Sequence, residues 1–194
     1  RRSGFRQILA KDTFVHHFGG VTLNEVRTKR GNYKTIIAMR PVFQNKWGVD
    51  PWESRGHLPF LDQLFGNIPA REVSARVLFI EPMFGEAILA VRNYFRRLQK
   101  KVVIDAVVCN ERYLTEAKYM ADTVLRRTAL DNLPDEVKEN YDAIILGAFL
   151  NVLPISEIVP FFIQSHEILK SNGFIYASLL NQNSFEHVME NLHN

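Results

Sequence analysis

The chain has 194 residues, of which 46% are hydrophobic and 23% are charged. These values are typical of a soluble globular protein and exclude disordered, collagen-like and low-complexity classes. The longest apolar stretches, 143–150 and 158–163, are far shorter than the roughly 20 residues that span a bilayer. No charged-then-apolar leader opens the chain, so we expect no transmembrane segment. The single cysteine, Cys109, allows no internal disulfide and indicates a reducing, cytoplasmic compartment.

The charge divides the chain into two regions. Residues 1–56 carry 11 Lys/Arg against 4 Asp/Glu, whereas residues 57–194 carry 13 against 17. A basic leading region could contact phosphate in a nucleic acid, a nucleotide-sugar or an anionic membrane surface, and a solvated surface is the alternative. We expect no nucleic-acid partner, because the basic cluster at 96–101 has no interleaved aromatic side chains on which bases could stack.

The leading region contains two predicted elements and a linker. Arg6–Val15 contains a possible strand, and Tyr33–Trp47 has a helical pattern that Pro41 should kink or divide. Residues 48–69 carry three glycines and three prolines, a frequency that suits a linker. We therefore expect a small N-terminal extension at 1–48, a Pro/Gly-rich linker at 49–70 and a second domain at 71–194.

The second region alternates strands and helices. An apolar run at 76–82 predicts a buried strand, and the spacing at 87–100 predicts an amphipathic helix. The same order recurs with a strand at 101–109 and a helix at 111–125, for which Asn110 is a plausible N-cap.

The alternation continues to the end of the chain. After a turn-like stretch at 131–134 come an apolar run at 141–149 and a helix at 156–170 that Ser156 could cap. A stop at 171–173 then leads to a fourth strand at 174–180. Apolar strands separated by helices of this length predict an α/β fold with a doubly wound, mostly parallel sheet.

Ligands of doubly wound sheets bind at the carboxyl ends of the strands, so the turn after the first strand, EPMFGE at 81–86, is the place to look. Here the sequence resembles the class I S-adenosylmethionine-dependent methyltransferases. The resemblance covers about residues 75–194 and rests on RVLFIEPMFGEAIL, YDAIILGAFLNVLP, HEILKSNGFIYASLL and the trailing 181–183. It implies a Rossmann-like fold and S-adenosylmethionine as the cofactor.

The resemblance also implies particular cofactor-binding residues. Glu81 stands where the family has the acidic residue that ends its first strand, and Phe84 and Gly85 lie in the turn that follows. Gly147, within the third apolar run, is also expected to bind the cofactor. Asn132 lies in the place of the family's loop near the adenine, although a turn beside a helix is an equally good interpretation.

The departures from the family pattern fall at these same positions. The family's turn carries several glycines, which let the backbone approach the cofactor without Cβ atoms in the way, and this turn keeps Gly85 alone. The family's second strand commonly ends in an acidic residue that binds the ribose hydroxyls. Val108 is its counterpart here, so that carboxylate is missing unless Glu111 reaches back. Two interpretations follow: an impaired or empty cofactor site, or genuine cofactor binding.

The leading region carries a second resemblance. A Val-His-His-Phe-Gly segment at 15–19 and a later Phe-x-x-Lys-Trp-Gly at 43–48 look like the C-terminal end of bacterial family two nucleotide-sugar glycosyltransferases, which act on surface polysaccharides. The resemblance implies that His17 could reach a metal-bound diphosphate, since histidine is a common ligand of divalent ions. A packed or solvated histidine is the alternative. A divalent metal is expected only if the glycosyltransferase part is complete.

Three functions remain open from the sequence. The chain could be the C-terminal part of a bacterial surface-glycan transferase with a degenerate, non-catalytic methyltransferase-like domain that holds an acceptor or partner. It could instead be an active O-methyltransferase acting on a sugar or glycan, or a module that binds another nucleotide in the same crevice. A glycan or nucleotide-sugar is the expected substrate of the associated glycosyltransferase. No catalytic residue or general base can be named from the sequence.

Overall fold

The computed structural model describes residues 34–50, 58–66, 68, 74–127 and 140–179. The chain divides into two compact units, Arg1–Trp52 and Glu53–Asn194, which are described separately. The strand expected at 6–15 and the turn expected at 131–134 lie outside the described residues.

The described part of the first unit is one helix and its end. Helix α2 (Lys34–Trp47) continues through Pro41, so the expectation that this proline divides it was wrong. The Phe-x-x-Lys-Trp-Gly motif closes the helix: the rings of Phe43 and Trp47 lie 6.3 Å apart, one turn from each other. Gly48 follows with φ of 70° and its N–H donates to Gln44 O at 2.7 Å, a helix ending that favours glycine.

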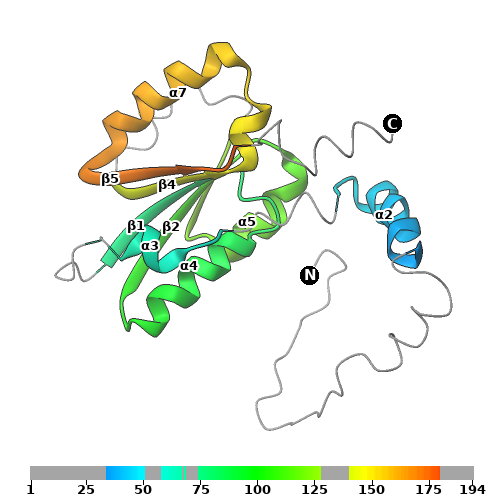
Figure 1. Ribbon diagram of the computed structural model, residues 1–194, viewed down its shortest axis with the longest axis horizontal. Coiled ribbons are helices and arrows are strands. Elements are labelled where there is room, and N and C mark those ends of the chain that lie inside the picture. Colours follow the sequence, from blue (N-terminus) through cyan, green and yellow to red (C-terminus); the bar gives the residue numbers. More distant parts are fainter. Residues whose placement is uncertain (1–33, 51–57, 67, 69–73, 128–139, 180–194) are drawn as a thin grey trace, which may run out of the picture. The chain divides into compact units, whose positions relative to one another are not determined.

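The second unit is built on one parallel sheet, as the alternation of elements predicted (Figure 1). Its strands lie in the order β3-β2-β1-β4-β5, and every neighbouring pair is parallel. The strands are β1 (Ser74–Ile80), β2 (Lys101–Val108), β3 (Thr123–Arg126), β4 (Tyr141–Gly147) and β5 (Leu169–Ala177). The predicted doubly wound α/β fold is therefore confirmed.

Helices cover both faces of this sheet. Helices α4 (Glu86–Arg97) and α5 (Leu114–Met120) lie on one face and α7 (Ile155–Ile168) on the other (Figure 1). The shorter elements are α3 (Leu61–Phe65) and the 3-10 helices η1 (Glu111–Tyr113) and η2 (Ala148–Val152). None of the helices in the described ranges is long and apolar enough to cross a membrane.

The helix predicted at 111–125 is shorter than expected, and the strand β3 that follows it was missed. The backbone becomes extended at Ala121, directly after the last residue of α5. Asp122 then holds the chain against β2, because its N–H donates to Ile104 O at 2.7 Å and its Oδ2 accepts from Ile104 N at 2.7 Å. A long-range backbone pairing thus overrides the local helical pattern of TVLR.

The last strand also starts earlier than predicted. β5 begins at Leu169, and between the pairs Tyr141↔Leu169 and Ala143↔Phe174 the four residues 170–173 of β5 lie opposite the single residue Asp142 of β4. The expected stop at 171–173 is therefore a bulge within the strand. A Cβ on Gly173 would lie 2.8 Å from Tyr141 O, so glycine is required there. Ser156 does not cap α7, whose N-cap is Pro154.

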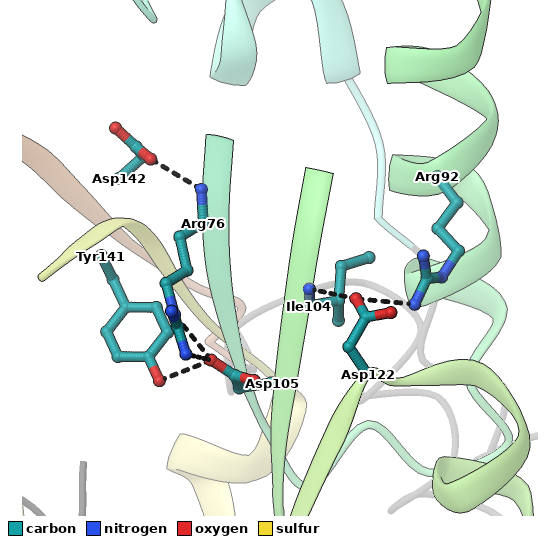
Figure 2. Close-up of polar contacts among 7 residues, drawn as sticks. All are labelled: Arg76, Arg92, Ile104, Asp105, Asp122, Tyr141 and Asp142. Atoms are coloured by element: carbon teal, nitrogen blue, oxygen red, sulfur yellow. Dashed lines mark hydrogen bonds and ion pairs between the residues drawn. The ribbon is translucent and has the colours of Figure 1, made fainter. Parts of the chain in front are cut away.

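Two buried carboxylates, Asp142 and Asp105, hold neighbouring strands of the sheet together (Figure 2). Asp142, 5% exposed, accepts from Arg76 N at 2.7 Å and from Lys170 Nζ at 2.8 Å, which ties β4 to β1 and β5. Asp105 accepts from the Arg76 guanidinium and from the Tyr141 hydroxyl, each at 2.9 Å. Burial, and then the bond to Asp105, raise the pKa of Tyr141 well above its usual value. Asp105 is thus a structural partner in the middle of β2 and does not reach the carboxyl ends of the strands.

Replacing Asp142 by alanine should lower the free energy of unfolding by about 2–4 kcal/mol, because it removes a buried carboxylate that accepts from Arg76 N and pairs with Lys170. Asp122→Ala is the matched control: Asp122 also accepts from a backbone N–H and pairs with a basic side chain, Arg92, but its own side chain is 45% exposed, so the loss should be about 1 kcal/mol. Urea unfolding of the full chain measures both. Equal losses of unfolding free energy in the two variants would contradict the conclusion that Asp142 stabilises the sheet more than Asp122 does.

Candidate functional site

The carboxyl edge of the sheet holds the candidate site. β1 is followed in the sheet by β2 and β3 on one side and by β4 and β5 on the other, so the strand order reverses between β1 and β4. A crevice outside the carboxyl ends of the strands at such a point is the usual ligand site of this architecture. The chain segments that border it here are 81–86, which follows β1, and 147–157, which follows β4.

Glu81 is the central side chain of this edge. It directly follows β1 and is only 6% exposed. Its Oε2 accepts from the N–H groups of Cys109 at 2.7 Å and Asn110 at 2.9 Å, whereas its buried Oε1 has no hydrogen-bond partner among the described residues. Burial raises the pKa of Glu81, and the two backbone donors act in the opposite direction. One carboxylate oxygen therefore joins β1 to the turn after β2, and the other is buried without a partner among the described residues.

The turn after β1 has the backbone shape of a glycine-rich loop without most of the glycines. Glu81 and Met83 have φ of 49° and 53°, in the left-handed region that L-residues rarely adopt, and Gly85 has φ of 76°. A Cβ on Gly85 would overlap the sulfur of Met120 from α5. The space that this glycine leaves is therefore filled by Met120, a contact that the sequence did not reveal because Met120 lies 35 positions further along the chain.

The segment that follows β2 is held by capping and by aromatic packing. The Asn110 side chain accepts from Arg112 N at 3.1 Å, so its predicted N-cap role is confirmed for η1. Phe84 and Tyr113 pack edge to face with ring centroids 5.6 Å apart, which links the turn after β1 to η1. Phe84 is half-buried, and its ring connects the turn after β1 to the segment after β2.

No carboxylate in the described segment after β2 takes the place of a ribose acceptor. Val108, the last residue of β2, is fully buried and apolar. Glu111 is exposed and pairs with Arg126 of β3 at 2.9 Å. The structure therefore places Glu111 in an ion pair at the β3 side of the edge.

The end of β4 is open. Gly147 has φ of 54° and ψ of −134°, and a Cβ built on it would meet nothing within 4 Å. Its carbonyl accepts from Ser178 N at 2.7 Å, and the Asn151 side chain donates to Ser178 O at 2.9 Å. The backbone conformation favours glycine at this position, and no atom in the described part of the chain crowds it.

Cys109 directly follows β2 and is half-buried. It packs against the hydrophobic cluster on the α7 face, together with Leu153 and Ile158 at the start of α7. Burial, then the charges of Glu81 and Glu157, raise the pKa of the Cys109 thiol to about 12. Glu157, in the first turn of α7, was not among the predicted site residues, because its effect on Cys109 depends on how α7 returns over the sheet.

Two predicted site residues, His17 and Asn132, lie outside the described residues. Within the residues that are described, no group of three or more His, Cys, Asp or Glu side chains could hold a metal ion. His166 lies on the outer face of α7, where it lines a shallow groove of about 440 Å³ with Val159, Phe162, Ile163 and Glu167. Nothing described there covers the groove.

Of the comparisons with known proteins, the one with solved structures supports the fold. Neither the family models nor the curated proteins contain a match. Among solved structures, a SAM-dependent methyltransferase from Archaeoglobus fulgidus is similar with a TM-score of 0.50 and 15% identity, covering 79% of this chain and 63% of that one. PKMT2 from Rickettsia typhi is similar with a TM-score of 0.47 and 19% identity, covering 62% and 24%. This chain therefore spans less than two thirds of either protein.

These comparisons and the sheet topology define the class of fold. The all-parallel five-stranded sheet with flanking helices is a Rossmann-like methyltransferase fold. At these identities the likeness concerns the fold, and the site has to be judged from its own residues.

The thiol of Cys109 provides a test of the electrostatics of this edge. Because its pKa is about 12 in the folded chain against 9.0 for an ordinary thiol, alkylation near pH 8 should be at least a hundredfold slower than in the guanidinium-unfolded chain. The protonated Cys109 thiol stabilises the folded chain fully below pH 9, and this stabilisation is lost as the pH rises towards 12. Iodoacetamide labelling followed by mass spectrometry measures the rate.

A variant separates the charge from the burial in that test. Glu81→Gln should speed labelling of Cys109 severalfold, because it removes a nearby negative charge that opposes the thiolate. Glu116→Gln, in α5, is the control and should leave the rate unchanged. A labelling rate that levels off below pH 10 would contradict the assigned environment.

Gly85→Ala should destabilise the chain by about 1–3 kcal/mol, through overlap with Met120 and through the left-handed backbone. In a Met120→Ala background the added cost should fall, because the overlap is removed and the backbone strain remains. Gly147→Ala is the matched control: it carries backbone strain without a neighbour, so Met120→Ala should not change its cost. Additive effects of Gly85→Ala and Met120→Ala in urea unfolding would show that the contact is absent.

Proposed function

We propose that residues 53–194 form a methyltransferase-fold domain of a glycan-building transferase, with a crevice that binds S-adenosylmethionine weakly and without efficient catalysis. In this proposal the domain holds an acceptor or partner for the rest of the enzyme. The likeness to solved methyltransferases supports the fold on which the proposal is built.

The end of β2 carries the weak-binding part of the proposal. The ribose hydroxyls of an adenosyl group need acceptors, and unpaired hydroxyls in a closed site cost about 1–3 kcal/mol each. Val108 is apolar and buried, and Glu111 is paired with Arg126. The space at Gly85 is already used by Met120. These residues do not fit a tightly held adenosyl group, and we derive no reaction step through it.

The glycan-building part of the proposal is supported by sequence motifs. The segments at 15–19 and 43–48 resemble the end of a family two glycosyltransferase in the expected order. The second segment ends α2 with the Phe43–Trp47 ring pair, and Lys46 Nζ lies 5.0 Å from the centre of the Trp47 ring. A nucleotide-sugar or glycan is accordingly the proposed substrate of the complete enzyme.

Calorimetric titration of the full chain with S-adenosylmethionine tests the proposal. We expect a dissociation constant above about 100 μM, because the ribose acceptors are missing. Where binding is measurable, Glu81→Ala should weaken it about tenfold by removing the remaining acceptor. A low-micromolar constant would overturn the weak-site proposal.

An active O-methyltransferase is the second candidate, and two observations favour it. Glu81 keeps an unpartnered buried oxygen beside the turn, and the space next to Gly147 is open. Tight binding of S-adenosylmethionine together with methyl transfer to a sugar hydroxyl would establish this candidate in place of the first.

A further inference from the structure

A cluster of basic residues lies where α4 turns into β2, apart from the candidate site. From residue 87 to residue 104 the chain has no aspartate or glutamate. Residues 57–194 as a whole carry 13 Lys/Arg against 17 Asp/Glu, so a concentration of positive charge is a local feature of this otherwise acidic region. The basic cluster consists of four residues within six positions: Arg96, Arg97, Lys100 and Lys101.

The charges of the basic cluster are not neutralised within the described part of the chain. None of its four side chains forms an ion pair with a described residue. Arg92, one turn earlier in α4, shows the contrast, because its guanidinium donates to Met120 O at 2.8 Å and pairs with Asp122 at 3.0 Å. Asp62 lies in α3, which packs on α4 through Phe65, and pairs with none of the four. Three of the four residues are exposed and Lys100 is half-buried.

Backbone hydrogen bonds hold the turn that carries the cluster. Gln99 N donates to Arg96 O at 3.1 Å, and Lys100 N donates to Phe95 O at 3.0 Å. This pair of bonds ends many helices, usually with glycine in the left-handed position that Gln99 takes here with φ of 56°. Leu98, the C-cap residue, is 48% exposed. The turn therefore presents an exposed leucine between two pairs of cations along the chain.

The basic cluster lies at the amino edge of the sheet, at the opposite end from the candidate site. Lys101 is the first residue of β2 and pairs with Ser74, the first residue of β1. Glu81 instead follows the last residue of β1. At about 3.3 Å per residue, the seven residues of β1 separate the two edges by about 23 Å. A flat surface that touches the cluster can therefore leave the carboxyl edge uncovered.

The side chains around the cluster favour a lipid surface over a nucleic acid. Single-stranded nucleic acids bind largely by stacking bases on exposed aromatic rings, but Tyr94 and Phe95 of α4 are only 4% and 2% exposed. The exposed apolar side chains of this part are the leucines Leu89 and Leu98, at 47% and 48%. At an anionic bilayer a leucine can enter the boundary of the acyl chains while the neighbouring cations contact the headgroups.

We propose that the basic cluster, with Leu98 between its two halves, is a docking surface for an anionic lipid bilayer. The contact is peripheral: the cations meet the headgroups, and the leucine alone enters the apolar boundary. The carboxyl edge of the sheet, with the candidate site, then faces the aqueous phase. This inference is independent of whether the site binds S-adenosylmethionine.

Sedimentation of the full chain with lipid vesicles tests the docking surface. Vesicles of phosphatidylcholine alone are compared with vesicles that contain phosphatidylglycerol in equal amount. We expect binding to the anionic vesicles only, and its loss when the salt concentration rises from about 0.1 M to about 0.5 M, because exposed charges are then screened. Equal binding to both kinds of vesicle, or binding to neither, would overturn the proposal.

Charge variants assign the binding to the cluster. The double variant Arg96→Gln/Arg97→Gln should weaken vesicle binding about 25-fold, because each cation near an anionic surface contributes about fivefold. Arg96→Lys/Arg97→Lys keeps the charge and should keep the affinity. Arg112→Gln/Arg126→Gln is the matched control, since it removes the same charge at the carboxyl edge and breaks only an exposed ion pair. Equal losses in the two glutamine variants would overturn the cluster as the docking surface.

A dye at the turn locates the contact, which is needed because residues 1–56 are also basic. Leu98→Cys carries an environment-sensitive NBD dye in a Cys109→Ala background, so that the chain has one thiol. Anionic vesicles should raise the emission at position 98 and shift it to the blue, and should leave the same dye on Arg126→Cys unchanged. A response at position 126 as large as that at 98, or no response at either, would overturn the docking surface.

A nucleic acid is the other outcome of these experiments. Leu98→Ser should weaken vesicle binding severalfold at unchanged net charge, because the leucine contributes only where it enters a lipid phase. A fluorescein-labelled single-stranded RNA is titrated with the same variants, and we expect no binding that depends on the cluster. RNA binding that Arg96→Gln/Arg97→Gln abolishes, or vesicle binding that Leu98→Ser leaves unchanged, would overturn the assignment of a lipid partner.

Discussion

The Glu81 carboxylate is the interaction on which the carboxyl edge of this domain depends. By accepting from the Cys109 and Asn110 amides it fixes the turn after β2 to the end of β1, and with that turn it fixes η1, Tyr113 and the ring contact to Phe84. Burying the Glu81 carboxylate costs desolvation free energy, and the left-handed backbone conformation of Glu81 adds conformational strain. Strain and burial at one polar residue are typical of functional sites, where the rest of the fold compensates them.

The turn after β1 shows how this fold can keep its shape with a different sequence in the turn. The left-handed backbone at Met83 shows that the turn is formed without the usual glycines, since the surrounding structure holds it. Val108 at the end of β2 is part of the buried core, and the half-buried Met120 fills the space beside Gly85. At both positions the side chain next to the turn is apolar and packs on protein.

Periodicity and punctuation were sufficient to predict the sheet. The runs at 76–82, 101–109 and 141–149 are buried strands because branched apolar residues without interruption suit a parallel sheet that is covered on both faces. Strand β3 was missed because its four residues carry no such signal, and Asp122 defines it only through Ile104, far along the chain. The residues of the candidate site divide in the same way. Glu81 and Gly147 could be placed from the sequence because each stands at the carboxyl end of a predicted strand. The contact of Met120 with Gly85 and the effect of the Glu157 charge on Cys109 depend on tertiary packing, which no local pattern encodes.

The irregular outer strands have a consequence for the solution behaviour of the sheet. A parallel sheet offers unpaired N–H and C=O groups along its two outermost strands, and a long, regular border invites another chain to add to it. β3 presents only four residues, and β5 is interrupted by the bulge that ends at Gly173. Among the described strands, both borders are therefore poor templates for the addition of a strand from another molecule.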